Sequence, residues 1–309
     1  MDINRSFKDF IKRILRQVFV GMQRLGLDVL PRHFYSEIPD IRKLRSDSAW
    51  RKPYSLIGVA GSDISEQLSN ATEVMSCVDG ELAMATHKLA CQQNGEAGFG
   101  QVESAFLYAI VRQRRPAHIL QIGCGVSTAV CLQAAAEVDG YSPVITCIEP
   151  YPTPFLSALA AKGVIKLIKE RAQDVSLSVI SDLPSNCLFF VDSSHTLGPS
   201  GEVTRIILEM LPRLKAGALV HFHDIKLPYD YDRRILDSAL FFPHESPLLH
   251  AFLVHNHRFK LFVSMSMLHY ARASDLASLL PGYSAQGNTD GLAEGTGHFP
   301  SSTYLEVIE

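Results

Sequence analysis

The central part of the chain alternates short apolar runs with helical patterns. Five apolar runs are typical of buried strands, and a helical or mixed segment follows each of them. The runs cover residues 118–122, 144–148, 164–168, 187–191 and 218–222. Strands that alternate with helices in this way predict a parallel sheet with helices on both faces.

Other patterns flank this central part. Helical periodicity covers residues 5–25, two stretches within 63–92 that are separated at Asp79 and Gly80, and residues 101–114. After Asp224 the pattern predicts a helix, a strand-like segment, a short helix and a final strand, over residues 248–256, 259–267, 274–280 and 303–308. The two late strands predict an antiparallel hairpin at one sheet edge.

Together these elements predict an α/β protein with a Rossmann-like, doubly wound sheet of seven strands. The sheet is expected to be mostly parallel, with the antiparallel hairpin at its C-terminal end. We expect two parts, an N-terminal helical and irregular extension over residues 1–95 and a ligand-binding domain over residues 96–309.

Residues 5–25 form an amphipathic pattern in which Lys8, Lys12, Arg13 and Arg16 lie largely away from the apolar stripe. A basic amphipathic helix can lie on an anionic membrane surface as a peripheral contact. Docking onto its own domain, or onto a second subunit in a homo-oligomer, explains the same stripe, and we favour docking because surface helices commonly show it.

Composition narrows the class of protein. The chain has 309 residues, of which 47% are hydrophobic and 20% charged, as is ordinary for a globular protein. A formal net charge of −3 gives no global reason to expect nucleic-acid binding. The six cysteines form no CxxC pair, which favours free thiols in a reducing compartment. With no signal peptide and no long apolar run, we expect a cytoplasmic protein.

The segment AHILQIGCGVS, residues 117–127, predicts a strand, a glycine turn and a helix. Small residues in such a turn let a ligand approach, and helix-terminal amides bind its polar groups. A dinucleotide fingerprint would have a third glycine where Thr128 stands, which weakens the case for a nicotinamide-dependent oxidoreductase. Glu149 ends the next strand and can accept both hydroxyls of a ribose.

Polar side chains also follow two later strands. Asp192 and His195 come after residues 187–191, and His223 and Asp224 end the strand over residues 218–222. Because neighbouring parallel strands end at the same crevice, Asp192, His195 and Asp224 are expected to converge there. Two carboxylates and an imidazole suit a divalent metal or a general base held by an acid. Capping of the following helix or turn is the alternative.

With these motifs in place, the chain resembles a class I S-adenosylmethionine-dependent methyltransferase. More narrowly, it is similar to a largely uncharacterised bacterial group of O-methyltransferase-like proteins. The similarity is carried by IGCGVSTAV, IEPYP, LFFVDSSHT, LPRLKAGALVHFHDIKLPYDY and LLHAFLVHNHRF, and it extends to LPRHFYSEIPD and FPSSTYLEV.

The resemblance implies roles for matching positions. S-adenosylmethionine would contact the glycine turn and Glu149, and the residues after the third strand would lie near its adenine. The implied cofactor-binding residues are Gln121, Gly123, Gly125, Ser127, Glu149, Gln173, Asp174 and Asp192. Asp192 and Asp224 would bind a metal such as Mg²⁺, and His195 would be the base. His223, Tyr229 and Tyr231 are candidates for the acceptor side, with loop packing as the alternative for the tyrosines.

The sequence also departs from the group. Gln121 stands where many relatives carry an acid, and Ile225 stands where catechol-type relatives have a polar ligand. The segment 243–245 keeps only the acid of a Trp-Asn-Glu pattern. These departures leave open a non-catalytic binding or scaffold protein on the same fold.

The favoured function is methyl transfer to a hydroxyl of a small molecule or a sugar-containing natural product. His195, with an ordinary pKa near 6.5, would accept the proton at neutral pH. The loop over residues 281–300 could serve as a lid over the substrate or be a plain surface connection.

Overall fold

The computed structural model describes residues 3–231, 241–284 and 299–309, with side chains from residue 7 onward. The chain divides into two units, Met1–Ser46 and Asp47–Glu309. The larger unit contains the sheet and the candidate site.

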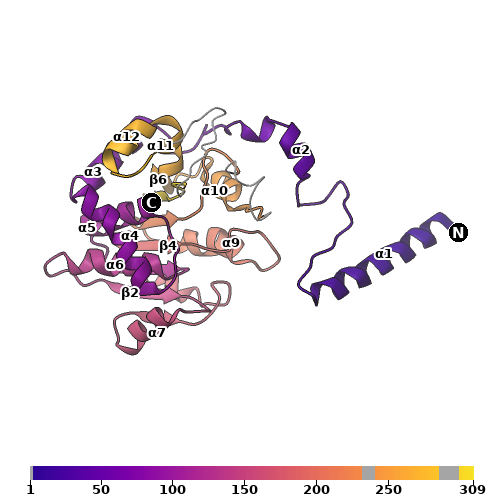
Figure 1. Cartoon of the computed structure of the whole chain (residues 1–309), viewed down its shortest axis with the longest axis horizontal. Helices are drawn as coiled ribbons and strands as arrows, with labels where there is room; N and C mark the ends of the chain where they lie inside the picture. Colours follow the sequence, from indigo (N-terminus) through magenta and orange to yellow (C-terminus); the bar gives the residue numbers. More distant parts are fainter. Residues whose placement is uncertain (1–2, 232–240, 285–298) are drawn as a thin grey trace. The chain divides into compact units, whose positions relative to one another are not determined.

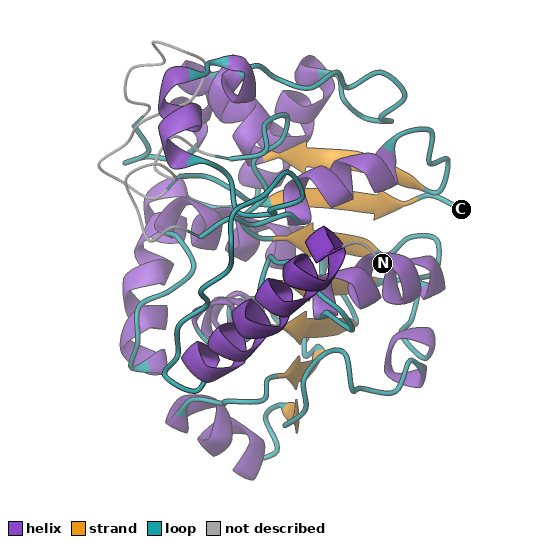
Figure 2. Cartoon of the chain, turned by 90° about the vertical axis from the view of Figure 1, so that its right-hand side faces the viewer, coloured by secondary structure: helices purple, strands orange, loops and turns teal. Residues whose placement is uncertain are grey.

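A seven-stranded sheet forms the centre of the larger unit (Figure 2). Its strands lie in the order β3-β2-β1-β4-β5-β7-β6. The strands β1 to β5 pair in parallel, whereas β7 runs antiparallel to both β5 and β6. Their bounds are β1 His118–Ile122, β2 Val144–Ile148, β3 Lys166–Ile168, β4 Cys187–Val191, β5 Leu219–Phe222, β6 Phe259–Ser264 and β7 Thr303–Val307. The predicted Rossmann-like fold, including the antiparallel C-terminal pair, is confirmed.

Helices surround the sheet within this unit (Figure 1). Their bounds are α3 Ile64–Met75, α4 Gly80–Asn94, α5 Gln101–Arg114, α6 Val126–Ala136, α7 Pro154–Ala161, α8 Ser178–Ser181, α9 Glu202–Arg205, α10 Glu245–Leu253, α11 Met265–Ala271 and α12 Ala273–Leu279. Short helical turns occupy Ala49–Arg51, Ile206–Met210 and Leu211–Arg213. The two helices predicted around Asp79 and Gly80 are present, and Asp79 caps α4 by accepting from the backbone N–H of Leu82.

One predicted strand is too long. The strand-like pattern over residues 259–267 ends as a strand at Ser264, and α11 begins at Met265. The first residues of α11 are as deeply buried as β6. Because they are buried, their side chains are apolar or small, like most of those in the strand. Periodicity cannot separate a buried strand from a buried helix in such a short run.

The compact unit begins at Asp47, well before the boundary expected at residue 95. The reason is that α4 packs against both α5 and α6, and α3 packs against α5 and β6. These helices therefore cover the sheet as part of the same body.

Side chains on both faces of the sheet are buried. Ile119 and Phe190 belong to one core cluster, whereas their chain neighbours Leu120 and Phe189 belong to the other. This period of two, with apolar residues on both sides, is expected of a parallel sheet that helices cover on each face. Full burial of such a side chain contributes about 1.5–3 kcal/mol, so the central strands fix the position of the loops at their carboxyl ends.

The smaller unit contains α1, Ile3–Gln23, and α2, Ile41–Ser46. The helix predicted over residues 5–25 is confirmed, and most of its apolar side chains are exposed, with Phe7 and Phe10 each more than half accessible. Docking of the apolar stripe onto the protein's own domain, a second subunit or a membrane surface stays a prediction. Among the described residues, no helix combines the length and the apolar character that crossing a membrane requires.

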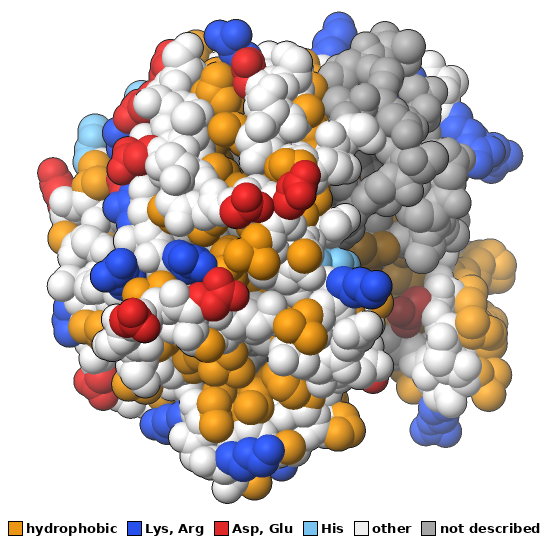
Figure 3. Space-filling view, turned by 60° about the vertical axis from the view of Figure 1, so that its left-hand side comes forward, with side chains coloured by type: hydrophobic (Ala, Val, Ile, Leu, Met, Phe, Trp, Pro, Cys, Tyr) orange, Lys and Arg blue, Asp and Glu red, His pale blue; other side chains and the backbone are white. Residues whose placement is uncertain are grey.

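The surface in Figure 3 carries basic and acidic side chains interspersed over one face of the molecule. Hydrophobic side chains lie between them. This mixture agrees with the small net charge of −3.

Candidate functional site

The turn between β1 and α6 requires glycine. Gly123 has a φ of +76°, and a Cβ there would lie 2.1 Å from the backbone oxygen of Asp192. Gly125 has a φ of +151°, and its Cβ would lie 3.1 Å from the side-chain amide of Asn94. The turn therefore fits closely between the end of β4 and the end of α4, and α6 begins directly behind it at Val126.

A cavity of about 320 Å³ opens beside this turn. The glycine turn, Glu149 after β2 and Asp192 after β4 all line it. The remaining lining residues are Asn94, Glu96, Ala97, Gly98, Phe99, Cys124, Val126, Ser127, Tyr151 and Thr153. The cavity thus lies at the carboxyl ends of β1, β2 and β4, where open α/β sheets bind their ligands.

The loop from Asn94 to Phe99 forms one wall of the cavity. Asn94 accepts a hydrogen bond from the hydroxyl of Thr153 at 3.0 Å, which joins the end of α4 to the start of α7. Phe99 is buried and its ring lies 5.5 Å from that of Phe190 and 5.1 Å from that of His223. No role was predicted for this segment from the sequence.

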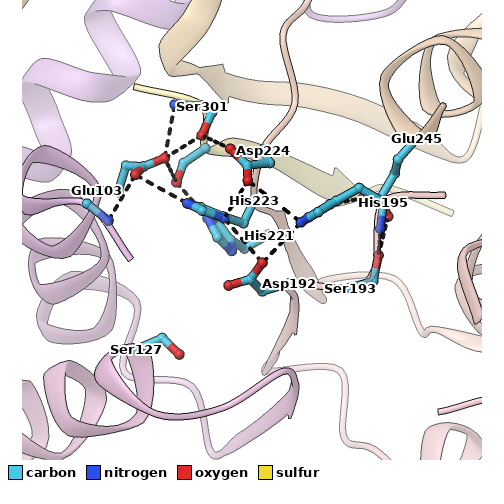
Figure 4. A network of polar contacts seen from close by, with 12 residues as sticks. Glu103, Ser127, Asp192, Ser193, His195, His221, His223, Asp224, Glu245 and Ser301 are labelled. Atoms are coloured by element: carbon cyan, nitrogen blue, oxygen red, sulfur yellow. Dashed lines mark hydrogen bonds and ion pairs between the residues drawn. The ribbon is translucent and has the colours of Figure 1, made fainter. Parts of the chain in front are cut away.

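A polar cluster adjoins the cavity at Asp192. Oδ1 of Asp192 lies 3.4 Å from Nε2 of His195 and 3.2 Å from Nδ1 of His223. Oδ2 of Asp224 lies 3.7 Å from each of the same two ring nitrogens. Figure 4 shows the two imidazoles directed toward Asp192 from different sides. The predicted convergence of the two strand ends is therefore present.

A second carboxylate holds each imidazole by its other nitrogen. Nδ1 of His195 lies 2.6 Å from Oε2 of Glu245, and Nε2 of His223 lies 3.3 Å from Oε2 of Glu103. Both glutamates are at most 1% exposed. The hydroxyl of Ser193 also donates to Glu245, at 3.1 Å. Each ring is consequently fixed in orientation, with one nitrogen facing Asp192.

Asp224 is fixed by neighbours of its own. It has a φ of +55°, and its Oδ1 accepts from Nζ of Lys226 at 3.0 Å and from the hydroxyl of Ser301 at 3.1 Å. The same Ser301 hydroxyl lies 2.8 Å from Oε1 of Glu103. The segment before β7 thereby ties the carboxylate after β5 to the one on α5.

Charge within the cluster shifts the pKa values of its members. Burial by itself lowers the pKa of His195, but hydrogen bonds to Asp192 and Glu245 outweigh burial and raise the pKa to about 10. Burial also opposes protonation of His223, yet Glu103 and Asp192 hold its pKa well above the ordinary value. Burial raises the pKa of Asp192, and the imidazoles reverse this and hold it far below its usual range. The pKa of His195 therefore differs from the ordinary value that the sequence suggested.

Three of the predicted cofactor-binding residues do not line this cavity. Gln121 is fully buried, and its side chain contacts the hydroxyls of Ser127 at 3.2 Å and Thr128 at 2.6 Å, so it supports the turn without lining the cavity. Gln173 and Asp174 are not among the lining residues. Asp174 instead pairs with Arg171 at 2.6 Å.

The candidates for the acceptor side are also placed. His223 is only 5% exposed and belongs to the cluster, so it does not face an open acceptor space. The ring of Tyr229 packs 4.7 Å from that of Tyr270, and the ring of Tyr231 lies 6.4 Å from that of Phe242. Neither tyrosine is among the residues that line the cavity. Most of the predicted lid, residues 285–298, lies outside the described residues.

The two buried glutamates, Glu103 and Glu245, were not predicted from the sequence as partners of the histidines. Glu103 is the third residue of α5 and also accepts from the backbone N–H of Gly100, as a capping acid would. A capping role was the only signal that its position offered. Glu245 could have been found, because it is the one acid kept from the group's pattern at residues 243–245.

The fold and the cavity define a Rossmann-like α/β protein with a ligand site at its glycine turn. Residues 120–225 match the model of a family described as a methyltransferase domain. The central part of the chain, from β1 to just after β5, is therefore similar in sequence to a methyltransferase domain.

Individual relatives are more distant. An uncharacterized protein of Archaeoglobus fulgidus is 29% identical over 171 residues, which cover 51% of this chain and 75% of that protein. Among solved structures, the methyltransferase PaMTH1 of Podospora anserina with bound S-adenosylhomocysteine has 15% identity, a TM-score of 0.41, and coverage of 92% of this chain and 100% of that one. The O-methyltransferase TomG of Streptomyces achromogenes has 16% identity, a TM-score of 0.44, and coverage of 74% and 90%.

Proposed function

We propose that the protein transfers a methyl group from S-adenosylmethionine to a hydroxyl of a small molecule, including sugar-containing natural products. The observation that supports this most is that one cavity is lined by both the glycine turn and Asp192. Asp192 is also a member of the polar cluster, so a ligand at the turn and an acceptor at the cluster would lie next to each other.

The residues around the turn fit S-adenosylmethionine. Glycines 123 and 125 leave space that a Cβ would fill, which lets the methionine end approach the backbone. Glu149 lines the same cavity, and we propose that its carboxylate accepts the ribose hydroxyls. When bound, S-adenosylmethionine supplies a methyl group that its sulfonium already activates, so the protein mainly aligns the acceptor and excludes water.

The acceptor hydroxyl must also lose a proton. Both ring nitrogens of His195 already face carboxylate oxygens, which leaves Asp192 and Asp224 as the groups with an exposed side. Their side chains are about one third accessible. We propose that these two acids orient the hydroxyl, that a divalent cation at the same place lowers its pKa, and that the proton passes to water at the exposed side of the two carboxylates.

Binding and turnover test the two halves of this proposal separately. Calorimetry with S-adenosylmethionine, S-adenosylhomocysteine and NAD should show binding of the first two compounds only. Turnover, measured as S-adenosylhomocysteine formed with phenolic and sugar acceptors, should be lost in Asp192→Asn and kept in Asp182→Asn, a control on the exposed end of α8. Binding of NAD alone would refute the methyl donor. Wild-type turnover in Asp192→Asn would refute the role of the acid.

A further inference from the structure

We propose that Asp192, His195 and His223 bind a first-row transition metal ion such as Zn²⁺, in preference to Mg²⁺. One ligand atom from each of these residues lies within 4.8 Å of the other two. This set contains two imidazoles, whereas the sequence suggested an all-oxygen pair of Asp192 and Asp224. Imidazole ligands suit zinc, iron and copper, whereas Mg²⁺ prefers oxygen.

Two of the three distances between the ligand atoms fit such an ion, and the third, between the two ring nitrogens, is at most 4.8 Å. Oδ1 of Asp192 is 3.4 Å from Nε2 of His195 and 3.2 Å from Nδ1 of His223. A tetrahedral ion with bonds of about 2.0–2.2 Å separates its ligand atoms by about 3.3–3.6 Å. Octahedral Mg²⁺, with bonds of about 2.0–2.1 Å, brings adjacent ligands to about 2.9 Å. The observed spacing is therefore closer to the tetrahedral arrangement.

Both histidines have the outer partners that metal-bound histidines use. A metal-ligating imidazole usually donates its other N–H to a carboxylate, which fixes the tautomer and turns the free nitrogen toward the ion. Glu245 accepts from Nδ1 of His195, and Glu103 accepts from Nε2 of His223. The two remaining nitrogens are those that face Asp192 (Figure 4).

A divalent ion is also compatible with the charges around the centre. Four carboxylates, from Glu103, Asp192, Asp224 and Glu245, surround the two rings. Without a metal, the two protonated imidazoles and the ammonium of Lys226 compensate three of these negative charges. A divalent ion between neutral imidazoles would take the place of the two ring protons and keep the same balance of charge. Three protein ligands would leave a position for an acceptor oxygen, as in catalytic zinc sites.

Metal titration tests this inference without any methyl donor. The full chain, treated with EDTA and then freed of it, is titrated with ZnCl₂, MnCl₂ and MgCl₂ by calorimetry. We expect one Zn²⁺ per chain, and binding of Mg²⁺ at least about 1,000-fold weaker because imidazole is a poor ligand for it. With CoCl₂ the wild-type chain should develop the strong visible bands of four-coordinate cobalt. No stoichiometric Zn²⁺ binding, or tighter binding of Mg²⁺, would overturn the inference.

Variants assign the ligands. Asp192→Asn and His195→Asn should abolish stoichiometric Zn²⁺ binding, and Glu245→Gln should weaken it by about 10–100-fold, since it acts only through His195. The control is His87→Asn with Cys91→Ser, because these two side chains lie 3.3 Å apart on α4 and could bind Zn²⁺ adventitiously. Wild-type binding in the first two variants, or its loss in the control, would contradict the assignment.

The outcomes for metal and methyl donor are separable. A chain that binds Zn²⁺ but not S-adenosylmethionine would keep this inference and refute the proposed function. A chain that binds S-adenosylmethionine but not Zn²⁺ would refute this inference and leave the proposed methyl transfer standing without a metal.

Discussion

Replacing Gly123 by alanine should damage the donor site and the polar cluster together. The new Cβ would lie 2.1 Å from the backbone oxygen of Asp192 and 3.0 Å from its carbonyl carbon. The first contact must lengthen by about 1 Å before it reaches the shortest distance that real Cβ atoms show. Either the turn or the end of β4 has to move, and Asp192 moves with it.

The size of the effect follows from comparison with another glycine. Gly140 has a similar φ of +72°, against +76° at Gly123, but a Cβ there would have no heavy atom within 4 Å. Both alanine variants lose about 1–2 kcal/mol because the left-handed conformation is unfavourable for a residue with a Cβ. Only Gly123→Ala adds the steric conflict.

Urea unfolding and calorimetry measure the two consequences. Gly140→Ala should lower the free energy of unfolding by the conformational amount and leave the affinity for S-adenosylmethionine within twofold. Gly123→Ala should lose more stability and at least tenfold in affinity, which corresponds to about 1.4 kcal/mol. Equal stabilities of the two variants, with wild-type affinity in Gly123→Ala, would refute the argument that the turn and Asp192 are in tight contact.

Three further predictions follow from other parts of the chain. Glu149→Gln should weaken binding of S-adenosylmethionine by about 10–100-fold in calorimetry, because hydrogen bonds to a charged group contribute about 1.5–3 kcal/mol. An unchanged affinity would exclude Glu149 as the ribose partner. Burial lowers the pKa of His269 to about 4, so below pH 6.5 the unfolded chain binds a proton that the folded chain does not. The free energy of unfolding should then fall by up to about 3 kcal/mol between pH 6.5 and 4. Urea unfolding should show a smaller fall in His269→Gln. The control variant His257→Gln, at an exposed histidine, should show the same fall as the unchanged protein. Finally, a chain that starts at Asp47 should bind S-adenosylmethionine with an affinity within twofold of that of the full chain, because the cavity residues all belong to the larger unit. If the apolar stripe of α1 is a membrane contact, only the full chain should cosediment with anionic vesicles.

The sequence predicts the centre of the fold well. The strands β1, β2 and β4 have the bounds expected from their apolar runs, because each run is short, buried over its last four residues and ended by glycine or a polar residue. The segment around Met265 was assigned wrongly because a buried helix follows a buried strand there without any charged residue between them, and the small side chains of Ser264 and Ser266 are buried with the rest.

The candidate site is predictable only in part. The positions of Asp192, His195 and Asp224 follow from topology alone, since parallel strands end at one edge of the sheet. The partners Glu103 and Glu245 come from helices, whose rotation and position depend on packing against the rest of the chain. The pKa of His195 depends on those partners, which is why its ordinary value could not be assumed from the sequence.

The place of β7 in the sheet has a consequence for synthesis of the protein. This strand lies between β5 and β6, and β6 pairs with β7 and with no other of the described strands. Until residues 303–307 have left the ribosome, β5 and β6 each present an edge with unpaired backbone groups, which is the kind of surface on which chains aggregate. Ser301, which joins Glu103 to Asp224, is made at the same late moment. The sheet and the polar cluster are therefore completed by the same segment, which is translated after all the other described strands.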